Sequence, residues 1–267
     1  TPDYSEVAKL TDLWLNPRQG TDAAMAMAMG HVILKEFHLE RDGKCPSQYF
    51  DDYCRRYTDM PFLVVLEERT LAEQSDVEQA SVQTHNGLTD TRYVPGRTLR
   101  ASDLETISDQ ENAEWKPVLL DENTNAVVVP MGTIGSRWDK SGRWNLDLKN
   151  CATGADIWPS KSLTRKHDEV VSVAFPYFGN QENEQEIFKH TDHDSILYRN
   201  MPVRKIATKA GEVLVVTVFD LMMANYGIDQ GLGGEGLANS YDDDEPYTPA
   251  WQEKITGVAR DKVITVA

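Results

Sequence analysis

The sequence is poor in cysteine and has no long apolar run. Its three cysteines, Cys45, Cys54 and Cys151, are an odd number without C-x-x-C spacing, which argues against both a disulfide framework and a zinc ribbon. The longest apolar stretch, residues 23–34, falls short of the roughly 20 residues that span a bilayer. We therefore expect a protein of a reducing compartment with no direct membrane insertion.

Basic residues are also scarce. Lys and Arg number 27 against 43 Asp and Glu, which gives a formal net charge of −16. This charge repels phosphate backbones and anionic lipid, so we expect no nucleic-acid partner. The acidic excess is concentrated in residues 101–125, 181–194 and 235–246, which we interpret as solvated loops. A hydrophobic content of 40% is too high for a disordered acidic coil and predicts a folded core.

Several catalytic and ligand-binding patterns are missing or misplaced. The chain has no G-x-S-x-G elbow, which leaves hydrolase chemistry unsupported. Gly231, Gly233 and Gly236 spell G-x-G-x-x-G, but the motif follows a predicted helix and precedes an acidic run instead of joining a strand to a helix. We interpret it as a flexible loop. The sequence shows no internal repeat.

The pattern of apolar residues, caps and turns predicts a mixed α/β chain. A hairpin is expected with its turn at Gly211 and Glu212, and Thr248 is expected to cap a short helix that begins at Pro249 and ends at Gly257. The other helices are predicted at residues 6–10, 23–37, 48–57 and 219–226, and strands at 1–5, 13–15, 62–66, 127–129, 144–148, 170–175, 203–206 and 213–218.

We expect the isolated ionisable residues to have structural rather than catalytic roles. His31 lies on the apolar helix and is expected to be a core or interface histidine. Cys54 stands beside two arginines that could lower its pKa, but no partner histidine is identifiable and we favour a structural role. The segments 190–194 and 242–245 carry ligand-like side chains without a complete metal-binding pattern. We therefore predict no catalytic residue and no metal ligand in this chain.

One constellation retains ligand-binding potential. Two polar turns are predicted at successive strand ends of one layer, the edge where open α/β sheets bind ligands. The carboxylate of Asp22 can accept hydrogen bonds from both N1–H and the exocyclic amine of guanine, although a capped helix would need the same residues. The candidate residues are Thr1, Pro2, Asp3, Tyr4 and Ser5 in the first turn, and Gly20, Thr21 and Asp22 in the second.

These residues resemble a known family, the molybdopterin oxidoreductases that carry a molybdenum bis(molybdopterin guanine dinucleotide) cofactor. Within it, the chain is most similar to the branch of catalytic alpha subunits of bacterial membrane-bound respiratory nitrate reductases. The triplet 20–22 and the string ITGV at 255–258 are shared broadly in the family. The matching strings are DLWLNPRQGTDAAMAMAMGHVILKEF (12–37), PSQYFDDYCRRYTDMPFLVVLEER (46–69), FPYFG (175–179), ANYGIDQGL (224–232) and YTPAWQEKITGV (247–258).

The resemblance implies a fold and a set of site residues. The fold would be a partial αβα layer with a β-rich insertion, divided into a cofactor-binding α/β segment at 1–68, the insertion at 69–169 and a return to the α/β core at 170–267. The turn 1–5 and the triplet 20–22 would bind the guanine dinucleotide end of one pterin. Thr1 stands where the family usually has an acidic or hydroxyl residue. The ligands of the molybdenum and of a 4Fe-4S cluster would lie outside this chain.

The resemblance also implies an activity and partners for a longer parent protein. That enzyme would reduce nitrate to nitrite by oxygen-atom transfer, with electrons from quinol through iron–sulfur clusters. Its partners would be an iron–sulfur beta subunit and a membrane cytochrome b subunit, which would hold it on the cytoplasmic side of the inner membrane. The 267-residue chain alone is expected to be inactive. The alternatives are a related molybdenum enzyme acting on chlorate, selenate or nitrite, and a non-catalytic acidic binding domain.

Overall fold

The computed structural model describes residues 4, 6–40, 48–69, 92–132, 147–176 and 196–267. The chain divides into two compact units, and the division falls inside one helix and two strands. Unit 1 consists of Thr1–Pro46, Phe175–Arg199 and Met223–Ala267, and unit 2 of Ser47–Ala174 and Asn200–Met222. The three-part division by sequence stays a prediction.

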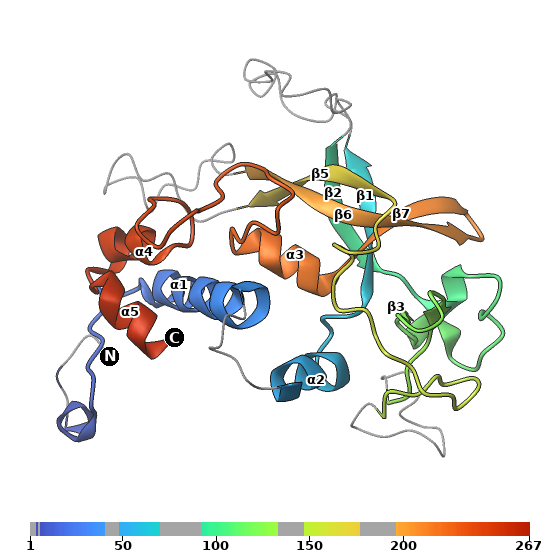
Figure 1. The fold of residues 1–267 in the computed structure, drawn as a ribbon, viewed down its shortest axis with the longest axis horizontal. Helices are drawn as coiled ribbons and strands as arrows, with labels where there is room; N and C mark the ends of the chain where they lie inside the picture. The colour runs from blue at the N-terminus through green and yellow to red at the C-terminus, as the bar shows by residue number, and fades with distance from the viewer. Residues whose placement is uncertain (1–3, 5, 41–47, 70–91, 133–146, 177–195) are drawn as a thin grey trace. The chain divides into compact units, whose positions relative to one another are not determined.

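Three helices dominate unit 1 (Figure 1). Helix α1 spans Asp22–Ile33 and continues as a π-helical segment over Leu34–Glu40, which confirms the helix predicted at 23–37. Its run of Ala and Met residues has high helix propensity. The other two are α4 (Pro249–Thr256) and α5 (Arg260–Val266). Thr248 accepts a hydrogen bond from the backbone N–H of Trp251, and Gly257 ends α4 in the left-handed conformation, both as predicted.

Helix α1 packs against both α4 and α5. Ala24 contacts Tyr247 and Trp251 at one end of α1, and Ala28 contacts Val258 and Val263 further along it. These small alanines allow the helices to approach closely. Gly30 likewise allows a close contact, here with the ring of Tyr226, because a methyl group at position 30 would overlap that ring.

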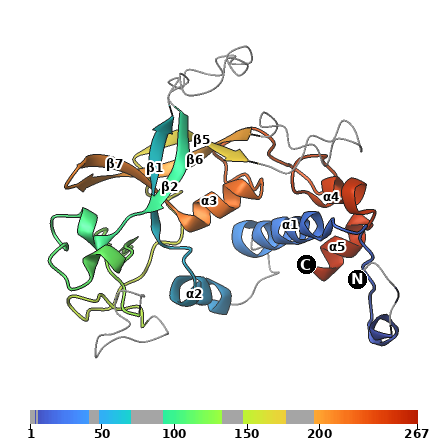
Figure 2. The same cartoon turned by 180° about the vertical axis from the view of Figure 1, so that it is seen from behind.

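Unit 2 contains most of a small closed barrel, with strand order β1-β2-β5-β6-β7. Strand β1 pairs antiparallel with β2 on one side and with β7 on the other, and β2 pairs parallel with β5 at Tyr93 and Val173. Figure 2 shows β1 and β2 side by side from behind. The strands are β1 (Leu63–Arg69), β2 (Arg92–Thr98), β5 (Glu169–Pro176), β6 (Ile196–Thr208) and β7 (Gly211–Thr217).

The predicted hairpin is formed by β6 and β7, which pair antiparallel from Arg204 opposite Val215 to Thr208 opposite Gly211. Its turn residues are Lys209 and Ala210, so the predicted turn position at 211–212 is wrong by two residues. The hydroxyl of Thr208 donates to the carbonyl of Gly211 and accepts the N–H of Ala210. This side chain closes the turn earlier than the glycine signal indicated.

Unit 2 also contains a second, short sheet. Strands β3 (Leu119–Leu120) and β4 (Val127–Val128) pair antiparallel. Helix α2 spans Gln48–Tyr57, and α3 spans Val218–Asn225 across the division between the units. The core contains Leu63, Leu99, Ala101, Leu104, Ala113, Val118, Val129 and Val215. The described residues therefore confirm a mixed α/β fold.

Three predicted strands are not found as strands among the described residues. Residues 13–15 form no strand; a run of three apolar residues is too short to establish a ladder by itself, and in unit 1 strand residues are described only at the ends of β5 and β6. The strand predicted at 144–148 lies mainly outside the described residues, and Leu148 has a positive φ of 47° and is not in a strand. The strand at 1–5 also lies outside them, except for Tyr4.

Candidate functional site

Of the first predicted turn, only Tyr4 belongs to the described residues. Its side chain is exposed, and its ring packs edge-on against Trp14 at a centroid distance of 5.1 Å. Thr1, Pro2, Asp3 and Ser5 lie outside the described part of the chain. Their role in ligand binding stays a prediction.

The second predicted turn has a geometry suited to a close ligand. Gly20 has a φ of +78°, which other residues adopt only with strain, and a Cβ built on it would meet nothing within 4 Å. The backbone at Gly20 therefore faces open space. Thr21 occupies the N-cap position of α1, but its hydroxyl donates to the carbonyl of Arg18 at 2.6 Å. Its side chain does not cap the helix; of the first N–H groups of α1, that of Ala24 donates to the carbonyl of Thr21, and no side-chain cap competes with a ligand for those of Asp22 and Ala23.

Asp22 is the first residue of α1 and is exposed. Within the described part of the chain, its carboxylate makes no hydrogen bond and no ion pair. The positive end of the helix dipole favours an anionic side chain at this position. Asp22 therefore presents two carboxylate oxygens to solvent beside the open face of Gly20, as an acceptor pair for a ligand with two adjacent donors.

The end of α4 holds this turn in place. The N–H of Arg18 donates to the carbonyl of Thr256 at 2.9 Å, and its guanidinium donates to the carbonyls of Lys254 at 3.3 Å and Ile255 at 3.4 Å. Residues 20–22 and 255–258, which the sequence comparison singled out separately, thus belong to one local structure. Arg18 is the residue that sequence reasoning missed; its position two residues before Gly20 was the available signal.

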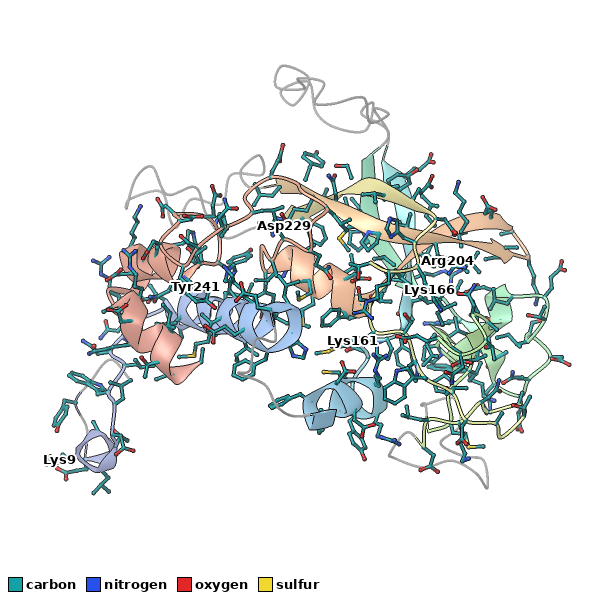
Figure 3. All side chains as sticks on the ribbon, in the orientation of Figure 1. Lys9, Lys161, Lys166, Arg204, Asp229 and Tyr241 are labelled. Carbon is teal, nitrogen blue, oxygen red and sulfur yellow. The ribbon has the colours of Figure 1, made fainter. Side chains whose placement is uncertain are left out.

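The Gly-rich segment at 231–236 is a loop, as predicted, and several hydrogen bonds hold its backbone. Asp229, labelled in Figure 3, accepts hydrogen bonds from the backbone N–H groups of Gly231, Leu232 and Gly233 through one carboxylate oxygen. The guanidinium of Arg199 donates to the carbonyls of Glu235 and Gly236. No described strand directly precedes the motif and no described helix directly follows it, so its surroundings support the rejection of a dinucleotide fingerprint.

Arg199 has an environment that the sequence did not signal. It is 1% exposed, and it also donates to the carbonyls of Ala224 and Asn225 at the end of α3. Burial lowers its pKa to about 10, which leaves the guanidinium charged at neutral pH. The cation therefore ties the glycine loop to the end of α3 through backbone oxygens.

His31 is fully buried, as predicted for a core histidine. Its Nδ1 lies 2.7 Å from the carbonyl of Tyr226 and must be the donor there, while Nε2 has no partner among the described residues. Burial lowers the pKa of His31 to about 4, and the charges of Lys35 and Arg199 act in the same direction. The side chain is therefore a neutral core group at physiological pH.

The third acidic segment, 235–246, carries exposed carboxylates, as predicted, and several of them are also paired. Asp242 pairs with Arg260, and Asp244 with Lys254. Asp243 accepts the N–H groups of Asn239 and Ser240. In the first segment, the buried Asp121 accepts backbone N–H groups and departs from the prediction, whereas Glu105, Asp109, Glu111 and Glu114 are exposed, as predicted. The second segment, 181–194, lies outside the described residues.

A cluster of buried charges in unit 2 is structural. Asp51 of α2 accepts from Lys161 at 2.7 Å and from Arg55 at 3.2 Å, and Figure 3 marks the position of Lys161. Burial opposes ionisation of Asp51, but the Lys161 hydrogen bond and both cations hold its pKa well below the usual range. Burial raises the pKa of Cys54, in agreement with its structural interpretation. The described residues contain no group of three or more ligands suited to a metal ion.

Comparisons with known proteins match the chain over its whole length, although no family model matches it. It is 48% identical over 269 residues to the respiratory nitrate reductase 2 alpha chain of Escherichia coli and 40% identical over 269 residues to the nitrate reductase alpha chain of Bacillus subtilis. In both cases the match covers 100% of this chain and 19% of the relative. The chain thus spans about a fifth of these relatives.

A more distant relative has a different named substrate. The perchlorate reductase subunit alpha of Dechloromonas aromatica is 32% identical over 76 residues, or 28% of this chain.

Among the helices of the described residues, none is long and apolar enough to cross a membrane.

Proposed function

The chain belongs to the family of respiratory nitrate reductase alpha chains, and we propose that it forms the part of such an enzyme that binds the guanine end of a molybdenum bis(molybdopterin guanine dinucleotide) cofactor. The observation that carries this proposal is the exposed Asp22 carboxylate, at the start of α1 beside the open backbone of Gly20. The described residues fit this group, because they offer an anionic acceptor pair, a helix start without a side-chain cap and room for close approach.

In this proposal Asp22 recognises the base. Guanine presents N1–H and its exocyclic amine side by side, and the two oxygens of one carboxylate can accept both. Gly20 lets the nucleotide approach the backbone, and Thr21 fixes the turn through its hydrogen bond to the Arg18 carbonyl. Thr1, Pro2, Asp3, Tyr4 and Ser5 would complete the binding surface.

When bound, the cofactor supplies the redox chemistry of the parent enzyme. We propose reduction of nitrate to nitrite by oxygen-atom transfer, with electrons from quinol through iron–sulfur clusters that include a 4Fe-4S cluster. Residues of this chain bind and orient the cofactor and take no proton from the substrate. The 267-residue chain alone is proposed to be inactive. The partial αβα layer would be completed around α1 by other parts of the longer protein.

The proposed partners follow from the same membership. They are an iron–sulfur beta subunit and a membrane cytochrome b subunit, which would hold the alpha chain on the cytoplasmic side of the bacterial inner membrane. Nitrate is favoured over another oxyanion because relatives named for nitrate match the whole chain, whereas the relative named for perchlorate matches 28% of it.

The test replaces Asp22 by Asn in the full-length alpha chain that contains this segment. Asn presents an N–H₂ group to the donors of guanine, so we expect cofactor dissociation to rise about 10- to 100-fold, the range for a lost hydrogen bond to a charged group. Bound guanine is measured as GMP released by acid hydrolysis of the purified enzyme. Asp261→Asn is the matched control, since Asp261 also lies exposed in the first turn of a helix. Equal nucleotide retention by both variants would contradict the proposal.

A further inference from the structure

The turn at residues 18–22, here called the recognition turn, is anchored to the C-terminal end of α4. Three successive carbonyls there, those of Lys254, Ile255 and Thr256, accept hydrogen bonds from Arg18. The last carbonyls of a helix have no partner inside the helix and carry its negative dipole end. They suit a cationic donor such as Arg18, and their direction is set by the last turn of α4.

Two buried side chains determine the shape of that last turn. Gln252 is 0% and Thr256 1% exposed. The Thr256 hydroxyl donates to Oε1 of Gln252 at 2.7 Å and accepts the N–H of Val258 at 3.0 Å. The Gln252 amide donates to the carbonyls of Pro249 and Val258. This network, which we call the Gln252–Thr256 clamp, joins both sides of the chain reversal at Gly257.

The clamp connects to Asp22 through a short chain of hydrogen bonds. The Thr256 carbonyl accepts the N–H of Arg18, and the Arg18 carbonyl accepts both the N–H and the hydroxyl of Thr21. Asp22 follows directly as the first residue of α1. A shift of the Thr256 carbonyl therefore moves the recognition turn, although neither clamp residue belongs to that turn.

We propose that Gln252 and Thr256 are positioning residues for guanine recognition, acting through Arg18 on the recognition turn. This inference rests on the proposed function and deepens it, because it identifies what sets the position of the Asp22 carboxylate. A misplacement of about 1 Å can cost up to about 100-fold where binding geometry is critical. We therefore expect loss of the clamp to weaken nucleotide retention at least about tenfold.

The experiment uses the full-length enzyme and three groups of variants. Thr256→Val removes the hydroxyl with little change in shape, and Thr256→Ser restores it. Arg18→Met removes the two guanidinium hydrogen bonds to the Lys254 and Ile255 carbonyls and leaves the backbone bond to Thr256 in place. Because Arg18 is exposed, this variant tests the anchor even if Thr256→Val proves unstable. Thr248→Val is the matched control, because Thr248 is a fully buried threonine of the same helix whose hydroxyl caps the opposite end.

The primary readout is the rate of GMP-containing cofactor loss at a fixed interval below each variant's own melting temperature. We expect Thr256→Val and Arg18→Met to lose the cofactor faster than the wild type. Thr256→Ser and Thr248→Val should lose it at the wild-type rate. The inference is overturned if Thr256→Val and Thr248→Val lose cofactor equally, or if Arg18→Met behaves as wild type. Asp22→Asn separates the two proposals: if it releases cofactor while the clamp variants do not, only this inference fails, and if it has no effect, the proposed function fails as well.

Discussion

Protonation of His31 is expected to destabilise the folded protein in acid. The group has a pKa of about 4 when buried, against 6.5 for the unperturbed side chain. Below pH 6.5 the unfolded chain takes up a proton that the folded chain excludes, so stability is complete above that pH and falls as the pH approaches 4. The difference corresponds to about 3 kcal/mol, at 1.36 kcal/mol for each unit of pKa.

The assay is urea denaturation followed by tryptophan fluorescence at pH 7.5 and pH 4.5, on the wild type and on His31→Asn. The Asn amide can keep the hydrogen bond that Nδ1 gives to the Tyr226 carbonyl, and it does not titrate. Carboxylates also take up protons in acid and change the free energy of unfolding of both proteins. The effect of His31 is therefore the difference between the wild type and the variant in the free energy lost from pH 7.5 to pH 4.5. We expect the wild type to lose about 2.5 kcal/mol more than the variant over this interval.

Val32→Ala is the control for general destabilisation. Val32 is the next residue of α1 and is 1% exposed, so its truncation should cost about 2 kcal/mol at both pH values. The reasoning is refuted if His31→Asn and the wild type lose the same stability between pH 7.5 and pH 4.5. It is also refuted if Val32→Ala reproduces the pH dependence of His31→Asn.

Two further pairs of variants test the packing of each unit. Gly234→Ala should cost more than about 2 kcal/mol, because φ is +141° and the new Cβ would lie 2.7 Å from Cα of Arg199, whereas Gly231→Ala should cost about 1 kcal/mol, since its Cβ meets open space; thermal denaturation of both variants checks the order. Asp51→Ala should cost about 3 to 5 kcal/mol by leaving the buried Lys161 ammonium without its carboxylate. Asp52→Ala removes a half-exposed pair with Arg56 and should cost under about 1 kcal/mol in the same urea titration.

The sequence predicted the local elements well where the signal itself is local. The apolar run of α1, the Thr248–Pro249 start of α4 and the Gly257 stop all depend on contacts within a few residues, and the structure confirms them. The residues that carry the family resemblance also form continuous strings of sequence. Membership could therefore be inferred from the strings alone, before any tertiary contact was known.

Contacts between residues far apart in the chain could not be predicted from the sequence. The closure of β1 onto β7 joins segments separated by about 150 residues, and no periodicity specifies such a partner. The anchor of the glycine loop, Arg199, comes from β6, which nothing in the loop's own sequence indicates. The pairing of Asp242 could not be predicted because its cation, Arg260, lies 18 residues further along the chain.

The recognition turn shows which features follow from local sequence and which depend on tertiary contacts. By itself the sequence determined that Gly20, Thr21 and Asp22 open a helix with an anionic first residue, because glycine conformation and helix dipoles are properties of a few adjacent residues. Only the tertiary structure decided that Arg18 donates to the end of α4, some 236 residues away. That contact depends on how α1 and α4 pack, and packing is fixed by the whole core rather than by any short stretch of chain.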